Sequence, residues 1–230
     1  MTGDRGREPV IAIDGPAGAG KSTVGRRLAQ RLGYRFIDTG AMYRALALSV
    51  DAAGLSPDDD EARLSAHLAR VNIRLEGDRL LLDGRDVTAE IRTPRISELT
   101  SRLTRLAAVR EKITPLQRRA AARGGVVLEG RDTGTVVVPD ADVKFYLDAT
   151  LDERARRRQA ELGARGVAVD LGTVREEIRQ RDVQDTTRAL APLRKADDAI
   201  GVDSSALTVD EVVERMLAEV VRRREAVRRW

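Results

Sequence analysis

Nine residues near the start of the chain have the composition of a phosphate-binding loop. They run from Gly15 to Thr23 and read GPAGAGKST, which matches the P-loop pattern G-x-x-x-x-G-K-[ST]. Glycines let the backbone curl so that successive N–H groups converge on phosphate oxygens. Lys21 would place a cation beside the β- and γ-phosphates, and the Ser22 hydroxyl would bind Mg²⁺ on the same phosphates. We therefore predict a nucleotide polyphosphate site formed by Gly15, Pro16, Ala17, Gly18, Ala19, Gly20, Lys21, Ser22 and Thr23.

The segments on either side of this loop predict the strand and the helix that such a loop requires. Residues 9–14 read as a buried strand, and KSTVGRRLAQRL reads as an amphipathic helix that ends at Gly33, a typical C-cap. A helix that begins at the loop adds its positive end to the phosphate site. Four further strands are expected at 34–38, 125–130, 142–148 and 198–203, of which 125–130 and 142–148 are expected in the core. Because helical segments separate them, the five strands predict an α/β fold with a parallel sheet that is covered on both faces.

Other parts of the chain carry signals for helices and for a hairpin. Ser56 and Pro57 mark the start of a helix that runs to about residue 70. Helical periodicity also runs from about 95 to 123, with a break or kink expected at Pro115. Residues 71–88 alternate apolar and polar side chains, which predicts a β-hairpin within an inserted lobe.

Composition excludes several classes of chemistry. The 230 residues include no cysteine and one histidine, so disulfides, thiolate metal sites, histidine-cluster metal sites and histidine-based triads are excluded. No apolar run is long enough to cross a bilayer, and the N-terminal MTGDRGREPV lacks the apolar core of a secretory signal. We therefore expect a globular cytoplasmic protein without a membrane partner.

The net charge of +4 raises the question of a nucleic-acid partner. Acids are interspersed with the basic residues in most of the chain, and only RRREAVRRW at the end is a clear basic run. Such a run on a final helix is usually a solvated face, so we expect no nucleic-acid partner. Four of the 41 basic residues are lysines, and the excess of arginine suits a protein that binds anions through planar charged groups.

The phosphate loop alone does not distinguish a switch, a motor and a kinase. A guanine-nucleotide switch usually carries an N-K-x-D run, which this sequence lacks, and RKADD does not match it. Motors and transporters of this class are generally larger and carry further signature segments. A kinase needs a second anion-binding region, and the lobe predicted around 71–88 is a candidate for it.

Five segments, in order along nearly the whole chain, resemble bacterial cytidylate kinases, a family of nucleoside monophosphate kinases. They are IDGPAGAGKST, FIDTGAMYRALAL, EGRDTGTVVVPDADVKFYLDA, ERARRR and RDVQDTTRALAPL. The chain departs from the family where Thr39 replaces the usual serine, which retains the hydroxyl. The resemblance implies a P-loop NTPase fold of the adenylate-kinase type, with ATP as the phosphate donor. It also implies a core formed by 1–38 and 104–230, a monophosphate-binding insertion at 39–103 that contains the hairpin 71–88, and a short lid at about 154–170.

The same resemblance implies how a CMP acceptor is bound. Its phosphate would contact Thr39, Arg44, Arg131 and Arg188. Its base would contact Ser101, Arg110 and Asp132, and its ribose would contact Arg181 and Asp185. Arg157 and Arg158 of the lid would reach the donor and transferring phosphates, which gives the catalytic set Lys21, Arg131, Arg157, Arg158 and Arg188. By spacing alone, Arg181 and Asp185 could equally form a salt bridge along a helix, and the roles of Arg154 and Arg156 stay open.

The chemistry of such a transfer agrees with the residue types present. The phosphate of a nucleoside monophosphate has a second pKa of about 6, so it is mostly a dianion at neutral pH and needs no general base. The difficulty is electrostatic, because two anionic phosphates must meet in line, and arginines with Mg²⁺ can offset their repulsion. Cytosine presents an amino donor at N4 that a carboxylate such as Asp132 can accept, whereas uracil presents an acceptor there.

The sequence therefore predicts a monomeric, Mg²⁺-dependent enzyme that transfers the γ-phosphate of ATP to CMP or dCMP. A kinase of the same architecture for UMP or another small acceptor is one alternative. A P-loop regulatory or nucleic-acid-binding protein is another.

Overall fold

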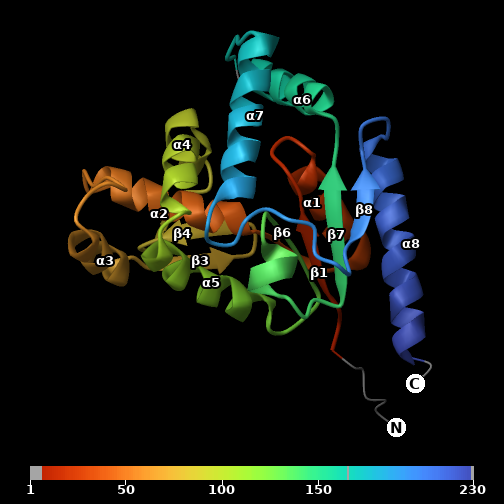
Figure 1. Cartoon of the computed structure of the whole chain (residues 1–230). Coiled ribbons are helices and arrows are strands. Elements are labelled where there is room, and N and C mark those ends of the chain that lie inside the picture. The colour runs from red at the N-terminus through yellow and green to blue at the C-terminus, as the bar shows by residue number, and fades with distance from the viewer. Residues whose placement is uncertain (1–6, 165, 229–230) are drawn as a thin grey trace. The chain divides into compact units, whose positions relative to one another are not determined.

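The structure, a computed structural model, describes residues 7–164 and 166–228. Its chain forms two compact units, one made of Met1–Ile37 with Ala121–Trp230 and the other of Asp38–Ala120 (Figure 1). The first unit carries the phosphate loop, and the second contains the segment 39–103 that the sequence predicts as an insertion. Among the described helices, none combines the length and the apolar character needed to span a bilayer.

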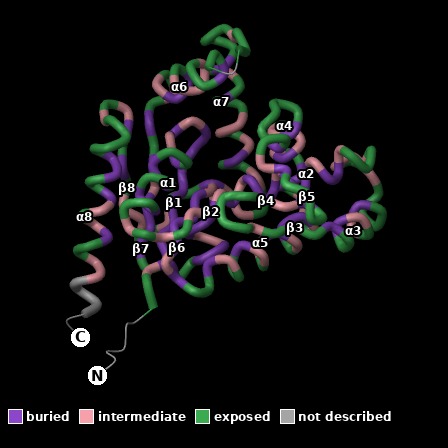
Figure 2. Tube along the Cα trace, turned by 180° about the vertical axis from the view of Figure 1, so that it is seen from behind, coloured by how far each residue is buried: buried purple, intermediate pink, exposed green. Residues whose placement is uncertain are grey.

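A five-stranded sheet lies at the centre of the first unit, in the order β2-β6-β1-β7-β8. Its strands are β1 (Val10–Asp14), β2 (Arg35–Asp38), β6 (Val126–Gly130), β7 (Val143–Asp148) and β8 (Ile200–Asp203). β1 pairs in parallel with β6 and β7, and β7 pairs in parallel with β8. Every residue of β1 is buried, as Figure 2 shows in purple. The predicted five-stranded parallel sheet is confirmed, and the carboxyl ends of β1, β6 and β7 meet at one edge of it.

Buried apolar side chains pack the helices of this unit against the sheet or against one another. The helices are α1 (Lys21–Leu32), α6 (Leu151–Gly163), α7 (Leu171–Thr187) and α8 (Val209–Arg228), and a π-helical turn, η2 (Thr133–Val137), follows β6. Leu28 of α1 and Met216 of α8 are fully buried in one cluster with Ile11 and Phe145 of the sheet. α6 and α7 pack on each other through a separate small cluster that includes Leu162. α1 therefore holds the phosphate loop directly over the end of β1.

The second unit combines helices with a small antiparallel sheet. Its elements are α2 (Thr39–Ala52), α3 (Glu61–Arg70), β3 (Ile73–Glu76), β4 (Arg79–Leu82), β5 (Arg85–Asp86), the 3-10 turn η1 (Glu90–Arg92), α4 (Pro94–Leu103) and α5 (Ala107–Ala121). β3 and β4 form a hairpin within the predicted 71–88, and β5 adds a short third strand. Ile113 of α5 is buried in the same cluster as Leu46 of α2, so α5 packs with this unit. The functional extent of the insertion, expected to end at 103, stays a prediction.

The helix expected from Ser56 begins later than predicted. α3 starts at Glu61, and Asp60 is its N-cap, because the Asp60 carboxylate accepts from the backbone N–H of Arg63 at 3.1 Å. Ser56 instead opens a turn, in which its own N–H donates to the Asp59 carboxylate at 2.7 Å. Aspartate is as good an N-cap as serine, so the serine–proline pair alone could not fix the start.

The break expected at Pro115 also lies elsewhere. α4 ends at Leu103, α5 begins at Ala107, and Pro115 lies inside α5. Proline removes the N–H that would bond the carbonyl four residues earlier, which belongs to Glu111. Glu111 and Pro115 are both exposed, so water can satisfy that carbonyl. The interruption at 104–106 includes Thr104, whose hydroxyl donates to the Ser101 carbonyl at 3.0 Å.

Candidate active site

The phosphate loop follows β1 and adopts backbone conformations that favour glycine. Gly18 and Gly20 have φ of 77° and 90°, and a Cβ on Gly15 would lie 1.9 Å from the Leu147 carbonyl oxygen. Lys21, the first residue of α1, is buried, and its Nζ donates to the Pro16 carbonyl at 2.6 Å. The loop's own backbone thus fixes the position of its lysine.

The charge on Lys21 is strongly disfavoured at this position. Burial, followed by the charge of Arg131, lowers its pKa from 10.5 to about 7. Arg181 also lowers the pKa, whereas the carboxylates of Glu129 and Asp14 raise it. A bound anion beside Lys21 would favour the ammonium form, so this position is electrostatically suited to a phosphate.

Glu129, which sequence reasoning missed, lies at the carboxyl end of β6. The Ser22 hydroxyl donates to its Oε1 at 2.5 Å, and Glu129 is buried. The described residues contain no group of three or more histidines, cysteines and carboxylates that could enclose a metal. Mg²⁺ at phosphate-transfer sites usually keeps several waters and takes one or two protein oxygens besides the phosphates. A serine oxygen next to a carboxylate fits that requirement.

Asp14, also missed from the sequence, joins the end of β1 to the turn that follows β6. Its two oxygens accept from the backbone N–H groups of Thr133 and Gly134 at 2.8 and 2.7 Å. Burial raises the pKa of Asp14 even though these N–H groups oppose the shift. A Cβ on Gly134 would lie 3.2 Å from the Lys144 side chain, so a larger residue there would require the turn or Lys144 to shift by a few tenths of an ångström.

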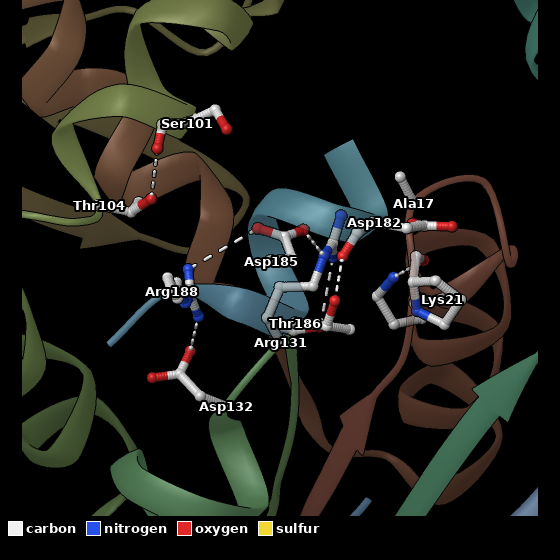
Figure 3. Close-up of polar contacts among 12 residues, drawn as sticks. Ala17, Lys21, Ser101, Thr104, Arg131, Asp132, Asp182, Asp185, Thr186 and Arg188 are labelled. Carbon is white, nitrogen blue, oxygen red and sulfur yellow. Dashed lines mark hydrogen bonds and ion pairs between the residues drawn. The ribbon is translucent and has the colours of Figure 1, made fainter. Parts of the chain in front are cut away.

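Arg131 follows β6 and forms an ion pair with α7. Its Nε donates to Asp185 Oδ2 at 2.9 Å, and both side chains are largely buried (Figure 3). Burial opposes the charge of Arg131, but the carboxylates of Asp185, Glu129 and Asp182 together outweigh it, so the pKa of Arg131 is raised. Burial likewise opposes ionisation of Asp185, but Arg131, Arg181 and Arg188 outweigh it and lower its pKa.

Arg188 connects this pair to Asp132. Its Nη2 donates to Asp132 Oδ1 at 3.5 Å, its Nη1 lies 3.8 Å from Asp185 Oδ1, and its Nε donates to the Ala191 carbonyl at 2.7 Å (Figure 3). Residues that are far apart in the sequence therefore form one charged cluster in the first unit. The predicted site residues of this unit that the structure brings together are Lys21, Ser22, Arg131, Asp132, Arg181, Asp185 and Arg188.

Four further predicted ligands belong to the second unit. Thr39, the buried first residue of α2, follows Asp38, which accepts from the Ala41 N–H at 2.8 Å and from Arg44 Nη2 at 2.7 Å. Arg110 is buried, and its Nη1 donates to the Thr104 carbonyl at 3.3 Å. Because Thr104 also bonds to Ser101, the predicted base ligands Ser101 and Arg110 are linked through one residue.

The predicted lid arginines are engaged with protein groups in this structure. Arg157 Nε lies 3.0 Å from Glu153, and its Nη2 donates to the Ser204 carbonyl at 2.6 Å. Arg158 forms an ion pair with Glu161 at 2.8 Å. Their contact with phosphates stays a prediction.

Comparisons with known proteins identify relatives of the whole chain. A model of the cytidylate kinase family matches residues 11–222. A cytidylate kinase from Geobacter sulfurreducens is 52% identical over 219 residues, which cover 94% of this chain and 94% of that protein. One from Syntrophotalea carbinolica is 50% identical over 223 residues, which cover 95% of this chain and 94% of that protein. An uncharacterized protein from Eubacterium ventriosum has a crystal structure that aligns with a TM-score of 0.54 at 12% identity, over 93% of this chain and 98% of that one, a likeness of fold alone. The chain belongs to the cytidylate kinase family.

Proposed function

We propose that this chain is a cytidylate kinase, which transfers the γ-phosphate of ATP to CMP or dCMP and releases ADP with CDP or dCDP. The observation that carries the proposal is the charged cluster of Arg131, Arg188 and Asp185. Both arginines pair with the Asp185 carboxylate, and the charge of Arg131 lowers the pKa of Lys21 in the phosphate loop. Such a cluster offers cations to two phosphates but no imidazole or thiol. Family membership supports CMP as the acceptor.

The transfer requires electrostatic work rather than a general base. The acceptor phosphate is mostly dianionic near neutral pH, so its oxygen is already a nucleophile. Two unit charges about 4 Å apart repel by roughly 4 kcal/mol at an effective dielectric constant of 20. Arg131 and Arg188 would offset this repulsion at the acceptor, and Lys21 would do so at the donor. Asp185 holds the Arg131 side chain in position through its hydrogen bond.

Mg²⁺ would bind at Ser22, with Glu129 next to it, and supply charge neutralisation on the donor phosphates. Glu129 orients the Ser22 hydroxyl by accepting its hydrogen bond. The same carboxylate favours the charged form of Lys21, which would help the loop bind an anionic donor.

Asp132 is the group that we assign to recognition of the base. A carboxylate can accept from the N4 amino group of cytosine but would face the O4 acceptor of uracil. We assign Ser101 and Arg110 of the second unit to the same base, and Arg181 and Asp185 to the ribose. The acceptor phosphate would be bound by Thr39 and Arg44 together with Arg131 and Arg188. The pairing of Arg44 with Asp38 supports this, because it keeps the guanidinium ordered near the start of α2.

We test the recognition of the base with Asp132→Ala, measured as CMP-dependent and UMP-dependent release of ADP. A bidentate or charge-assisted base contact is worth about 1–3 kcal/mol, so kcat/KM for CMP should fall by roughly ten- to hundredfold. The value for UMP should change much less, because the carboxylate does not favour uracil. Asp140→Ala, a removal of an exposed acid eight residues away, serves as the control and should leave both values unchanged. Equal losses for CMP and UMP would remove Asp132 from base recognition.

We further propose a monomer that acts in the cytoplasm without a nucleic-acid or membrane partner. The interspersed acids support the absence of a nucleic-acid partner, and the lack of cysteine is compatible with the cytoplasm. The competing regulatory or nucleic-acid-binding function predicts tight, salt-sensitive binding in a filter assay with single- and double-stranded DNA and RNA. It also predicts no consumption of ATP that depends on CMP.

A further inference from the structure

The start of α6, most of which the resemblance assigns to the lid at about 154–170, lies directly against the phosphate loop. A Cβ on Gly18 would come within 3.1 Å of both the Cβ and the carbonyl oxygen of Arg154. A Cβ on Gly20 would lie 3.8 Å from Nη1 of Arg157. Both contacts occur within the first unit. The first two turns of α6 therefore form part of the wall behind the loop.

Arg154 makes three hydrogen bonds there and is 7% exposed. Its Nε donates to the Ala149 carbonyl at 2.9 Å. Its Nη1 donates to the Ala17 carbonyl of the phosphate loop at 3.1 Å and to Asp182 Oδ2 of α7 at 2.6 Å. The planar guanidinium suits this use, because its donors point in fixed directions and it carries its charge at every relevant pH.

The contact with Ala17 has a direct consequence for the loop. A loop that binds phosphates with its N–H groups turns carbonyl oxygens the other way, and a buried carbonyl without a donor is costly. Arg154 supplies the donor for Ala17. Ser204, which is 2% exposed, lies behind the next part of the loop, with its hydroxyl 3.3 Å from the Ala19 carbonyl and 3.0 Å from Nη1 of Arg157. Arg154 and Arg157, about one turn apart on α6, thus support the carbonyl side of the phosphate loop, Arg154 directly at Ala17 and Arg157 through Ser204 at Ala19.

The contact with Asp182 links the loop to α7. Asp182 follows Arg181 and precedes Asp185 by less than one helical turn, so all three lie on the part of α7 that faces the charged cluster. The Asp182 carboxylate is largely buried, and its second oxygen has no hydrogen-bond partner among the described residues. Loss of Arg154 would leave this charge without its salt bridge, which is costly for a buried carboxylate.

We infer that Arg154 is a positioning residue. It fixes the Ala17 carbonyl of the donor loop and, through Asp182, fixes that loop against the helix that carries Arg181 and Asp185. In this role the guanidinium of Arg154 does not touch a phosphate. The inference rests on the proposed function only in taking the loop as the donor site and α7 as part of the acceptor site.

The test uses Arg154→Met, Arg154→Lys, Asp182→Asn and the double variant Arg154→Met/Asp182→Asn. The dissociation constant of ADP with Mg²⁺ is measured by calorimetry, beside kcat, KM for ATP and Tm. Arg154→Met should weaken ADP binding by about tenfold or more, because a charged hydrogen bond to the loop is lost. Arg154→Lys should recover only part of the affinity, since an ammonium cannot reproduce the forked geometry.

The double variant with Asp182 shows whether Arg154 positions the loop or contacts a phosphate itself. Asp182→Asn should weaken ADP binding less than Arg154→Met, and the double variant should bind no worse than Arg154→Met alone. Arg179→Met, which removes an exposed arginine of α7 paired with Glu176, is the matched control and should change binding by less than about twofold.

Several results would overturn the inference. One is unchanged ADP affinity in Arg154→Met with a loss confined to kcat, which would indicate contact with the transferring phosphate. A lower Tm with normal ADP binding would indicate a structural role alone. Fully multiplicative losses in the double variant would also contradict it. If Arg154→Met does not fold, Arg154→Lys and its combination with Asp182→Asn decide the same question. Because ADP binding needs no acceptor, the result is independent of whether CMP is the acceptor.

Discussion

Lys21 shows that a residue suited to bind phosphate is held at a cost to the folded protein. It is buried near Arg131 and Arg181, and its pKa of about 7 means that the folded state disfavours the ammonium. In the unfolded chain the same lysine stays protonated up to about pH 10.5. Between these pH values the unfolded state therefore binds more protons than the folded state. The contribution of Lys21 to the free energy of unfolding consequently rises with pH across that window.

Lys21→Met should therefore abolish phosphate transfer and raise Tm. The gain should be largest at and below pH 7, where the wild type must bury a charged lysine, and should shrink as the pH rises toward 10.5. The full difference in pKa corresponds to at most about 5 kcal/mol, and loss of the hydrogen bond to Pro16 offsets about 1 kcal/mol of it. Calorimetry at several pH values measures the effect, with the exposed Lys195→Met as control. A lower Tm for Lys21→Met at neutral pH would show that the burial of charge is not costly here.

At the scale of elements, the site depends on how the turn η2 is held against β1. Asp14 at the end of β1 accepts from Thr133 and Gly134, and the Lys144 side chain lies against Gly134. Lys144 cannot move freely, because it is buried and its Nζ lies 2.9 Å from Asp198. The position of Asp132, one residue before the turn, follows from these contacts.

Gly134→Ala tests this packing. The added Cβ would lie 3.2 Å from Lys144 Cδ and 3.4 Å from Asp14 Oδ2, so the turn must shift by a few tenths of an ångström. We expect the free energy of unfolding, and with it Tm, to fall by the roughly 1–3 kcal/mol that overpacking a core costs. KM for CMP should rise more than KM for ATP. Gly201→Ala provides the matched control, because its new Cβ would meet only the mobile end of the Lys195 side chain. Equal changes in both KM values would show that η2 does not position the acceptor.

The elements also show which features can be read from a sequence. The five strands follow from short runs rich in apolar residues, of which β1, β6 and β7 are mostly buried, and the phosphate loop follows from a pattern within nine residues. The start of α3 was wrong by several residues because Asp60 competes with Ser56 as a cap. Glu129 and Asp14 were missed, and the role of Arg154 stayed open, because their partners are 107, 119 and 137 residues away in the sequence and are brought close only by the fold. An acid at the carboxyl end of a core strand was the one signal that could have indicated Glu129.

At the scale of the whole molecule, the proposed ligands are divided between two packing units. The first contributes the phosphate loop and the cluster around Arg131 and Asp185, and the second contributes Thr39, Arg44, Ser101 and Arg110. Each set is organised internally by ion pairs, such as Arg44 with Asp38. Preorganised cations of this kind stabilise the charge of a phosphoryl transfer without rearrangement at the moment of reaction.

The most direct measurement is ADP release by the wild-type protein from ATP and Mg²⁺ over a panel of CMP, dCMP, UMP, AMP and GMP, with a sample that lacks any acceptor. We expect rapid release with CMP and dCMP, and a kcat/KM for UMP that is lower by about tenfold or more, as expected for a carboxylate that reads the N4 amino group. Release without an acceptor should be slow. Equal turnover of UMP and CMP, or release that does not depend on any monophosphate, would contradict the assignment of this chain as a cytidylate kinase.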